Sequence, residues 1–245
     1  MPEGGTEKEL RKVHPLADQT DITIEGIVAA SKGLIVSCQA YPGEPLRTPE
    51  VTARMCQAVV EGGAVAVRVQ GVVDISAARQ AVQVPVVGLI KYGHDGVYIT
   101  PSVAHARACA LAGASIVAID ATDRPRLGAT FADACAAIHD EFPGVAVMAD
   151  CGSLDDALRA EDAGADLIGT TLGGYTPDRP KTDGPDFEFI DQVCERIQKP
   201  IVVEGRIHTV EQLREVWTRP IHAACVGTAI THPTSITRWF ADVTK

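Results

Sequence analysis

The sequence lacks several features that would identify whole classes of protein. No apolar run approaches the roughly 18 residues that a membrane-spanning helix needs, and the charged first thirty residues contain no apolar segment typical of a secretory signal. The 245 residues include 22 Lys and Arg against 32 Asp and Glu, a net charge of −10, so no basic stripe is available to bind nucleic acid. We therefore expect a cytoplasmic chain with neither a membrane nor a nucleic-acid partner.

The cysteines and histidines are spaced in a way that disfavours two further kinds of site. The seven cysteines include no C-x-x-C pair, and the histidines are not grouped, so we expect no zinc or other metal site. An odd number of cysteines without a secretory signal also indicates reduced thiols rather than a disulfide framework.

The sequence does contain a repeated alternation of short apolar segments and helical patterns, beginning at Leu34. The repeating unit is about 25 residues long, which suits one strand, one helix and their loops. Eight such units predict a single α/β domain, a (β/α)8 TIM barrel. The alternative is a doubly wound open sheet, which usually has a Gly-rich turn after its first strand, and that turn is missing here. The predicted strands are residues 34–38, 65–69, 86–90, 116–120, 145–150, 167–170, 201–204 and 223–226.

Start signals for helices lie between the predicted strands. Thr48 precedes Pro49, and Thr100 precedes Pro101, which in both places predicts an N-cap followed by proline at the first helical position. Thr209 with Gln212 has the spacing of a capping box. Glycines that can adopt a left-handed C-cap follow several helical patterns, at positions 63, 113 and 164.

The start of the chain differs from the rest. We predict that residues 1–32 form an N-terminal extension and that residues 33–245 form the catalytic barrel domain. Residues 1–6 are expected to be a disordered tail. Ile24, Ile27 and Val28 follow, and they indicate a short helix or turn that closes the bottom of the barrel.

Polar side chains follow nearly every predicted strand, and a TIM barrel builds its active site from the residues at these strand ends. Lys91 comes directly after a buried apolar run, where it can serve as a base, an iminium former or a phosphate clamp. Two cations and three carboxylates would converge on one rim, which favours a functional site over scattered surface residues. The polar strand-end residues are Gln39, Arg68, Lys91, Asp120, Asp150, Thr170, Thr171 and Glu204.

The loops after the last two strands are rich in glycine. Gly205 and Arg206 follow the seventh strand, and Gly227 and Thr228 follow the eighth. Loops at these positions form the usual phosphate site of the fold, so we assign these four residues to phosphate binding. The long segment 172–187 is predicted to be a lid, with Tyr175 as its best candidate to face a ligand.

Nine stretches of the barrel resemble one family in the same order along the chain. They identify the chain as similar to the bacterial N-acetylmannosamine-6-phosphate 2-epimerase family. The stretches are Gly-Leu-Ile-Val-Ser-Cys-Gln-Ala at 33–40, Ile-Lys at 90–91, Val-Tyr-Ile-Thr-Pro at 97–101, Asp-Ala-Thr at 120–122, Met-Ala-Asp at 148–150, Ile-Gly-Thr-Thr-Leu at 168–172, Gly-Tyr-Thr at 174–176, Glu-Gly-Arg-Ile at 204–207 and Val-Gly-Thr-Ala-Ile-Thr at 226–231.

The resemblance implies an isomerase that needs no cofactor and interconverts N-acetylmannosamine 6-phosphate and N-acetylglucosamine 6-phosphate in the breakdown of sialic acid and amino sugars. It implies that Lys91 is the catalytic base and Glu204 its acidic partner. It also implies that Gln39, Arg68 and Asp150 contact the sugar. Thr171 and Tyr175 complete the predicted substrate-binding residues.

Two other functions use the same residue pattern and stay open at this point. A Schiff-base aldolase or lyase acting on a phosphosugar would place Lys91 in the same way. A phosphosugar-binding barrel without catalysis would keep the phosphate loops, although Lys91 and Glu204 together argue against it. The expected partner is a small phosphosugar. The sequence does not distinguish a homodimer from a monomer.

Overall fold

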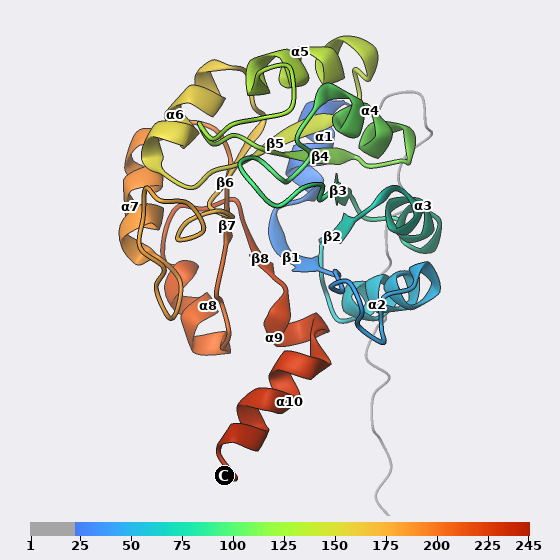
Figure 1. Ribbon diagram of the computed structural model, residues 1–245, viewed down its shortest axis with the longest axis vertical. Helices are drawn as coiled ribbons and strands as arrows, with labels where there is room; N and C mark the ends of the chain where they lie inside the picture. Colours follow the sequence, from blue (N-terminus) through green and yellow to red (C-terminus); the bar gives the residue numbers. More distant parts are fainter. Residues whose placement is uncertain (1–22) are drawn as a thin grey trace, which may run out of the picture.

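The computed structural model describes residues 23–245, and these residues form the predicted barrel (Figure 1). Eight parallel strands pair in sequence order, and β1 pairs with β8 to close the sheet. No helix among the described residues is long and apolar enough to cross a membrane. The strands are β1 (Gly33–Ser37), β2 (Ala66–Gln70), β3 (Val86–Leu89), β4 (Ile116–Asp120), β5 (Ala146–Asp150), β6 (Leu167–Gly169), β7 (Ile201–Glu204) and β8 (Ala223–Val226).

The strands are apolar on both faces because each face is covered. Val87 and Leu89 of β3 point into the barrel, where they join an interior cluster with residues such as Met148 and Val202. Val86 belongs instead to a cluster that faces the outer helices. This alternation has the two-residue period of a strand. It accounts for the unbroken apolar run at this point of the sequence.

The helices surround the strands in sequence order from α2 to α8 (Figure 1). Thr48 caps α2 and Thr209 forms a full capping box with Gln212, as predicted. The N-cap predicted at Thr100 is wrong, because Ser102 accepts from the His105 N–H and caps α4. The bounds are α2 (Pro49–Glu61), α3 (Val72–Ala81), α4 (Val103–Leu111), α5 (Phe131–Glu141), α6 (Leu154–Asp162), α7 (Phe187–Arg196) and α8 (Val210–Val216).

The short helix α1 (Ile24–Ala30) lies against the end of the barrel at which the strands begin. Ile27 is buried and joins the interior cluster together with Ile35 of β1 and Ala223, the first residue of β8. His222 contacts the Val28 carbonyl at 2.9 Å and the Ser31 hydroxyl at 3.3 Å. The tail predicted for residues 1–6 lies outside the described residues, and the division at residue 32 stays a prediction.

The C-terminal helix α10 (Pro233–Asp242) follows the single turn α9 (Thr228–Thr231) and runs away from the barrel (Figure 1). None of its residues is buried. Phe240 is 74% exposed, and Val243, just beyond the helix, is 86% exposed. The helix therefore carries apolar side chains that nothing in the described residues covers.

Candidate active site

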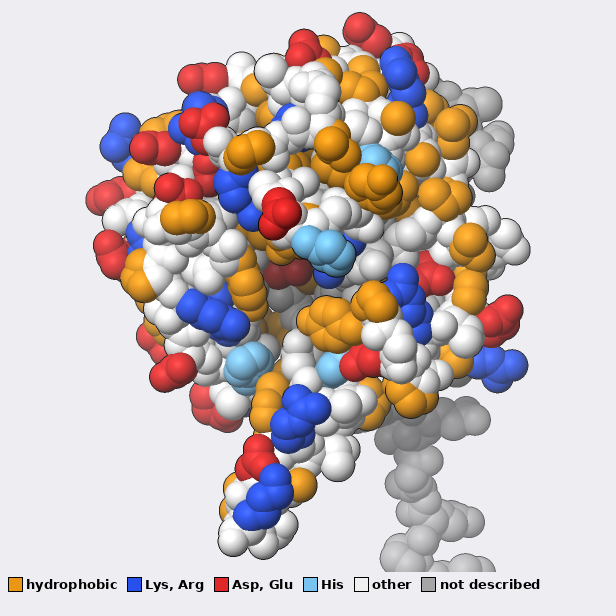
Figure 2. Space-filling view, in the orientation of Figure 1, with side chains coloured by type: hydrophobic (Ala, Val, Ile, Leu, Met, Phe, Trp, Pro, Cys, Tyr) orange, Lys and Arg blue, Asp and Glu red, His pale blue; other side chains and the backbone are white. Residues whose placement is uncertain are grey.

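A cavity of about 630 Å³ opens at the end of the barrel where the strands finish. Figure 2 shows this face hollowed near its middle, with histidine side chains beside the hollow. Such a volume is typical of a small-molecule site. Every predicted site residue except Asp150 lines it: Gln39, Arg68, Lys91, Thr171, Tyr175, Glu204, Gly205, Arg206, Gly227 and Thr228.

A buried cluster of charges forms the floor of the cavity. Arg68 of β2 binds the Asp150 carboxylate of β5 with two hydrogen bonds of 3.1 and 2.7 Å. Its Nη1 also lies 3.4 Å from Oε2 of Glu204 at the end of β7. Arg68 is 1% exposed and Asp150 0%. Burial alone would lower the pKa of Arg68, but the two carboxylates outweigh it and raise the pKa.

Glu204 is held in a way that favours its protonated form. Burial raises the pKa of its carboxyl and nearby Asp150 adds to the effect, whereas Arg68 opposes it. The Thr171 hydroxyl lies 2.7 Å from Oδ1 of Asp150 and 3.3 Å from Oε2 of Glu204. A single hydroxyl thus joins two carboxylates that start from different strands. Thr171 was predicted only to bind substrate, and these contacts show that it also holds the two carboxylates.

Lys91 lies two residues beyond the end of β3, in a loop that folds back on itself. It forms an antiparallel bridge with Ile99, and its ammonium lies 5.8 Å from the centre of the Tyr41 ring. Water in the open mouth reaches the side chain. The protein walls around it nevertheless lower its pKa by partial desolvation, and the positive charge of Arg68 lowers it further. A lysine with a lowered pKa supplies more neutral amine at physiological pH.

Two polar atoms on the cavity wall have no hydrogen-bond partner in the described part of the chain. They are Oε1 of Gln39 and Nε of Arg68. The other end of the Gln39 amide is fixed, because Nε2 donates to the Ser37 hydroxyl at 2.8 Å. One acceptor and one donor beside the cavity are therefore left without the partner that buried polar groups normally have.

The predicted phosphate residues lie together, but Arg206 is already engaged. Its guanidinium donates to the carbonyl of Gly173 at 2.8 Å, to that of Gly184 at 3.0 Å and to the Thr182 hydroxyl at 3.0 and 3.2 Å. It also lies 5.5 Å from the centre of the Tyr175 ring. Arg206 thus holds the predicted lid against the barrel, a function that the sequence did not indicate.

Gly227 and Gly205 stand at positions that favour glycine for two different reasons, a close neighbour at Gly227 and a positive φ at Gly205. A Cβ added at Gly227 would lie 3.2 Å from the Cβ of Ser37 on the neighbouring strand β1. Gly205 has a φ of 122°, which a residue with a side chain rarely adopts. The two glycines keep the backbone at the β7 and β8 ends exposed to the cavity.

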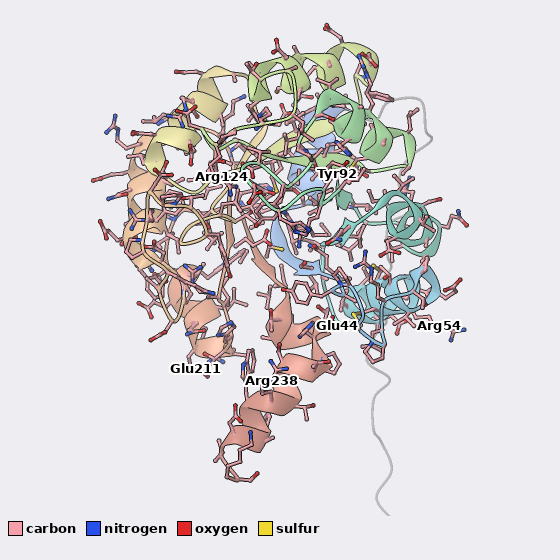
Figure 3. All side chains as sticks on the ribbon, viewed as in Figure 1. Glu44, Arg54, Tyr92, Arg124, Glu211 and Arg238 are labelled. Atoms are coloured by element: carbon pink, nitrogen blue, oxygen red, sulfur yellow. The ribbon has the colours of Figure 1, made fainter. Side chains whose placement is uncertain are left out.

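Asp120, like Asp150, is a strand-end carboxylate that does not line the cavity. It accepts from the Thr122 hydroxyl and from Arg124, each at 2.6 Å, and so holds the loop that follows β4. Arg124 belongs to the loop between β4 and α5 and is labelled in Figure 3. Asp120 therefore supports a loop rather than the site.

Several cavity residues were not predicted from the sequence. His232 is buried, and its Nε2 lies 2.5 Å from Oε1 of Glu44, so the loops after β8 and β1 are joined. Tyr41 and Arg47 line the mouth from the same loop after β1. They lie several residues beyond the strand, where no pattern marks a residue as facing the cavity.

Comparison with known proteins gives one consistent family. The family model described as "Putative N-acetylmannosamine-6-phosphate epimerase" matches residues 52–245. A protein from Cutibacterium acnes named "Putative N-acetylmannosamine-6-phosphate 2-epimerase" is 55% identical over 222 residues, which cover 89% of this chain and 96% of that protein. A protein of the same name from Caldanaerobacter subterraneus is 44% identical over 216 residues, covering 87% of this chain and 91% of the relative.

Solved structures give the same picture. The structure of N-acetylmannosamine-6-phosphate 2-epimerase from Clostridium perfringens superposes with a TM-score of 0.85 at 37% identity, covering 89% of this chain and 96% of the other. Thiamine phosphate pyrophosphorylase from Pyrococcus furiosus superposes with a TM-score of 0.57 at 19% identity, covering 86% of this chain and 93% of the other. The second likeness concerns the fold alone.

Proposed function

The chain belongs to the N-acetylmannosamine-6-phosphate epimerase family, and we propose how its own residues carry out that reaction. It is an isomerase that interconverts N-acetylmannosamine 6-phosphate and N-acetylglucosamine 6-phosphate. The observation that carries the proposal is that Lys91, with a lowered pKa, and Glu204, with a raised pKa, line one cavity. Groups whose surroundings shift their pKa values toward neutrality suit general acid–base work.

The reaction inverts one carbon, C2, which lies next to the C1 aldehyde in the open-chain sugar. The neutral amine of Lys91 takes the C2 proton, and the electron pair moves onto the aldehyde oxygen to give an enolate. The carboxyl of Glu204 then delivers a proton to the opposite face of C2. The pair ends as an ammonium and a carboxylate, which is the state that starts the reverse reaction, and proton exchange with water restores the neutral amine and the carboxylic acid before the next forward turnover.

Arg68 and Asp150 support this exchange by holding Glu204. Their bidentate pair fixes Arg68 in place, and Arg68 in turn lies against Oε2 of Glu204. We assign the free Nε of Arg68 and the free Oε1 of Gln39 to polar groups of the sugar. Thr171 and Tyr175 border the same space.

The phosphate is assigned to the backbone around Gly205, Gly227 and Thr228, with Arg206 at its edge. Backbone N–H groups at this end of a barrel commonly bind phosphate. Arg206 would both close the lid and add charge, since its guanidinium has five N–H donors and not all of them are used by the loop.

We further propose a cytoplasmic homodimer. The support is α10, which projects from the barrel and exposes Trp239 and Phe240 without burying any residue. Sedimentation of the purified chain should give twice the mass of 25.9 kDa. Phe240→Glu should shift it toward the monomer if this helix forms the contact.

The reaction is tested by incubating the protein with N-acetylmannosamine 6-phosphate in D₂O and observing C2 by NMR. An epimerase incorporates deuterium at C2 and produces the gluco epimer. Cleavage of the carbon chain would instead indicate a lyase, in which a borohydride-trapped adduct should form on Lys91. The absence of exchange, epimerisation and cleavage would indicate a binding protein.

A further inference from the structure

The backbone of Thr100 is unusual for its residue type. Its φ is 47°, and only Arg206 shares a positive φ among the non-glycine residues that the structure describes. A β-branched residue rarely adopts this conformation, because Cβ crowds its own backbone. Thr100 is also completely buried. Since Ser102 caps α4, the strained conformation does not serve the start of that helix.

The Thr100 side chain joins two strands just beyond the end of their backbone ladder. β3 and β4 pair directly at Val87 and Gly88 of β3. Farther along, the Thr100 hydroxyl donates to the Ala118 carbonyl of β4 at 2.6 Å and accepts from the Ile90 N–H at 3.2 Å. The Thr100 hydroxyl thus links the chain after β3 to β4 beyond the last residues that pair in the β3–β4 ladder.

The same residue closes the base of the loop that carries Lys91. The Thr100 N–H donates to the Ile90 carbonyl at 2.6 Å, and the Tyr92 N–H donates to the Tyr98 carbonyl at 2.9 Å. Between these two bonds, Lys91 bridges to Ile99. Residues 91–99 therefore form a hairpin whose base is the Ile90–Thr100 pair, and Lys91 is the first residue above that base.

We propose that Thr100 is a positioning residue whose buried hydroxyl and strained backbone hold Lys91 in the cavity. The proposal rests on the proposed function, in which Lys91 is the base. Strained backbone conformations persist where the surrounding structure enforces them, and they are frequent at functional sites. Exact placement of a catalytic group matters, because a displacement of about 1 Å can cost about 10²-fold in rate.

The other catalytic residue is held in a similar way. The Thr170 hydroxyl accepts from the Glu204 N–H at 3.0 Å and donates to the Glu204 carbonyl at 2.9 Å. Thr170 directly follows the end of β6, and Thr100 closes the base of the hairpin that follows β3. Both catalytic side chains thus leave a backbone that a buried threonine hydroxyl fixes where strand pairing stops.

A loosened hairpin would change the surroundings of the Lys91 ammonium in a defined direction. Partial desolvation lowers the pKa of Lys91, so movement of the side chain toward bulk water would raise it. The charged groups that face it are Arg47 from the loop after β1, Arg68 of β2, Asp150 of β5 and Glu204 of β7.

The test compares Thr100→Val with Thr100→Ser. Valine keeps the branched shape but lacks the hydroxyl, so we expect kcat to fall by about tenfold to a hundredfold, with KM little changed. The alkaline limb of kcat/KM should move to higher pH. In protein labelled with ¹³Cε-lysine, the Lys91 resonance, assigned by its loss in Lys91→Ala, should titrate at higher pH. Thr100→Ser should restore all three quantities.

Two further variants make the result decisive. Thr100→Gly also lacks the hydroxyl but tolerates a positive φ, so it tests the hydroxyl should the valine variant fail to fold. Thr52→Val removes another buried threonine hydroxyl, on α2, and should leave the Lys91 titration unchanged.

The proposal is overturned if the Thr100 variants lose activity while the Lys91 titration and the alkaline limb stay in place. It is also overturned if kcat does not change. The NMR titration reports Lys91 without substrate, so this result stands apart from whether Lys91 is the base, which Lys91→Ala decides.

Discussion

The two ends of the barrel are built on opposite principles. At the end where the strands finish, Arg68 and Asp150 are buried charges, and the two non-glycine residues with positive φ within residues 23–245, Thr100 and Arg206, lie nearby. At the end where the strands begin, α1 packs Ile27 against apolar residues of the interior. The end where the strands finish combines buried charges with strained backbone, whereas α1 makes apolar contacts at the end where the strands begin.

The groups that react lie at one end of the barrel, and apolar contacts that stabilise the fold lie at the other. A buried ion pair is weak evidence for stability, because desolvation of both charges offsets most of their attraction. Strained backbone also costs free energy, about 1–3 kcal/mol for each residue. Burial of Ile27 at the opposite end provides favourable free energy through a side chain that cannot react. Substitutions at the two ends should therefore affect different measurements.

The largest effect is expected at the mouth, for Lys91→Ala. The amine that takes the C2 proton is lost, and no other ionisable side chain is proposed to act on that face of the sugar. Both epimerisation and C2 exchange should fall by at least about 10³-fold, within the range that general base catalysis supplies. The midpoint of thermal unfolding should change little, because water reaches Lys91 in the open mouth. Turnover of Lys91→Ala near the wild-type rate would show that Lys91 is not the catalytic base.

A smaller effect is expected for Glu204→Gln, which keeps the shape of the side chain and removes the acid. Net epimerisation should fall by about 10²-fold or more. Exchange of the C2 proton through Lys91 should persist for the epimer whose proton faces that residue. Both rates are measured in D₂O from each epimer. If exchange and epimerisation fall together and only modestly, Glu204 is a structural partner of Arg68.

Removal of the phosphate from the substrate should lower kcat/KM by at least about a hundredfold, since two or three charge-assisted hydrogen bonds are each worth roughly 1.5–3 kcal/mol. The measurement compares N-acetylmannosamine with its 6-phosphate. A matched variant, Thr228→Val, keeps the backbone N–H groups and should lose much less. Equal turnover of the two sugars would show that the residues around Gly227 do not bind phosphate.

The sequence predicted the mouth better than the details that hold it together. Strands end where apolar runs meet polar residues, so the sequence alone predicts that Arg68, Asp150 and Glu204 lie at one rim. Thr100 could not be assigned correctly, because Thr-Pro at 100–101 has the same local pattern as Thr-Pro at 48–49. Only the fold shows that Ser102 takes the cap and leaves the Thr100 hydroxyl for Ile90 and Ala118.

Contacts between distant segments were also beyond prediction from local patterns. Arg206 is in a glycine-rich loop that suggested phosphate, yet its hydrogen bonds to Gly173 and Gly184 depend on how the lid folds. Glu44 and His232 meet because β1 and β8 are neighbours in the closed barrel. The direction of α10 has no local signal at all.

The pH dependence of activity should show that Lys91 and Glu204 titrate as a coupled pair. In both directions of the reaction, Lys91 and Glu204 together hold one proton. Activity should therefore fall as pH decreases through the raised pKa of Glu204, and fall again as pH increases through the lowered pKa of Lys91. The kcat/KM profile should be narrower than free lysine and glutamate would give, and have the same shape for both epimers. Different shapes for the two epimers would contradict a single shared proton.

The smallest effect on activity is expected at the opposite end, for Ile27→Ala. Truncation of a buried Ile typically costs about 2–5 kcal/mol, and the edge position of α1 favours the lower figure. A domain of this size should then unfold about 4–8 °C lower, at about 2–4 °C for each kcal/mol. Leu111→Ala is the matched control, because Leu111 is 76% exposed on α4 and should leave the unfolding midpoint nearly unchanged. At a temperature where both variants are folded, each should keep the wild-type kcat and pH profile, since α1 contacts none of the residues that move protons. A loss of kcat in Ile27→Ala without a loss of stability would mean that the two ends of the barrel are coupled, and that apolar packing at the bottom helps to place the charges at the mouth.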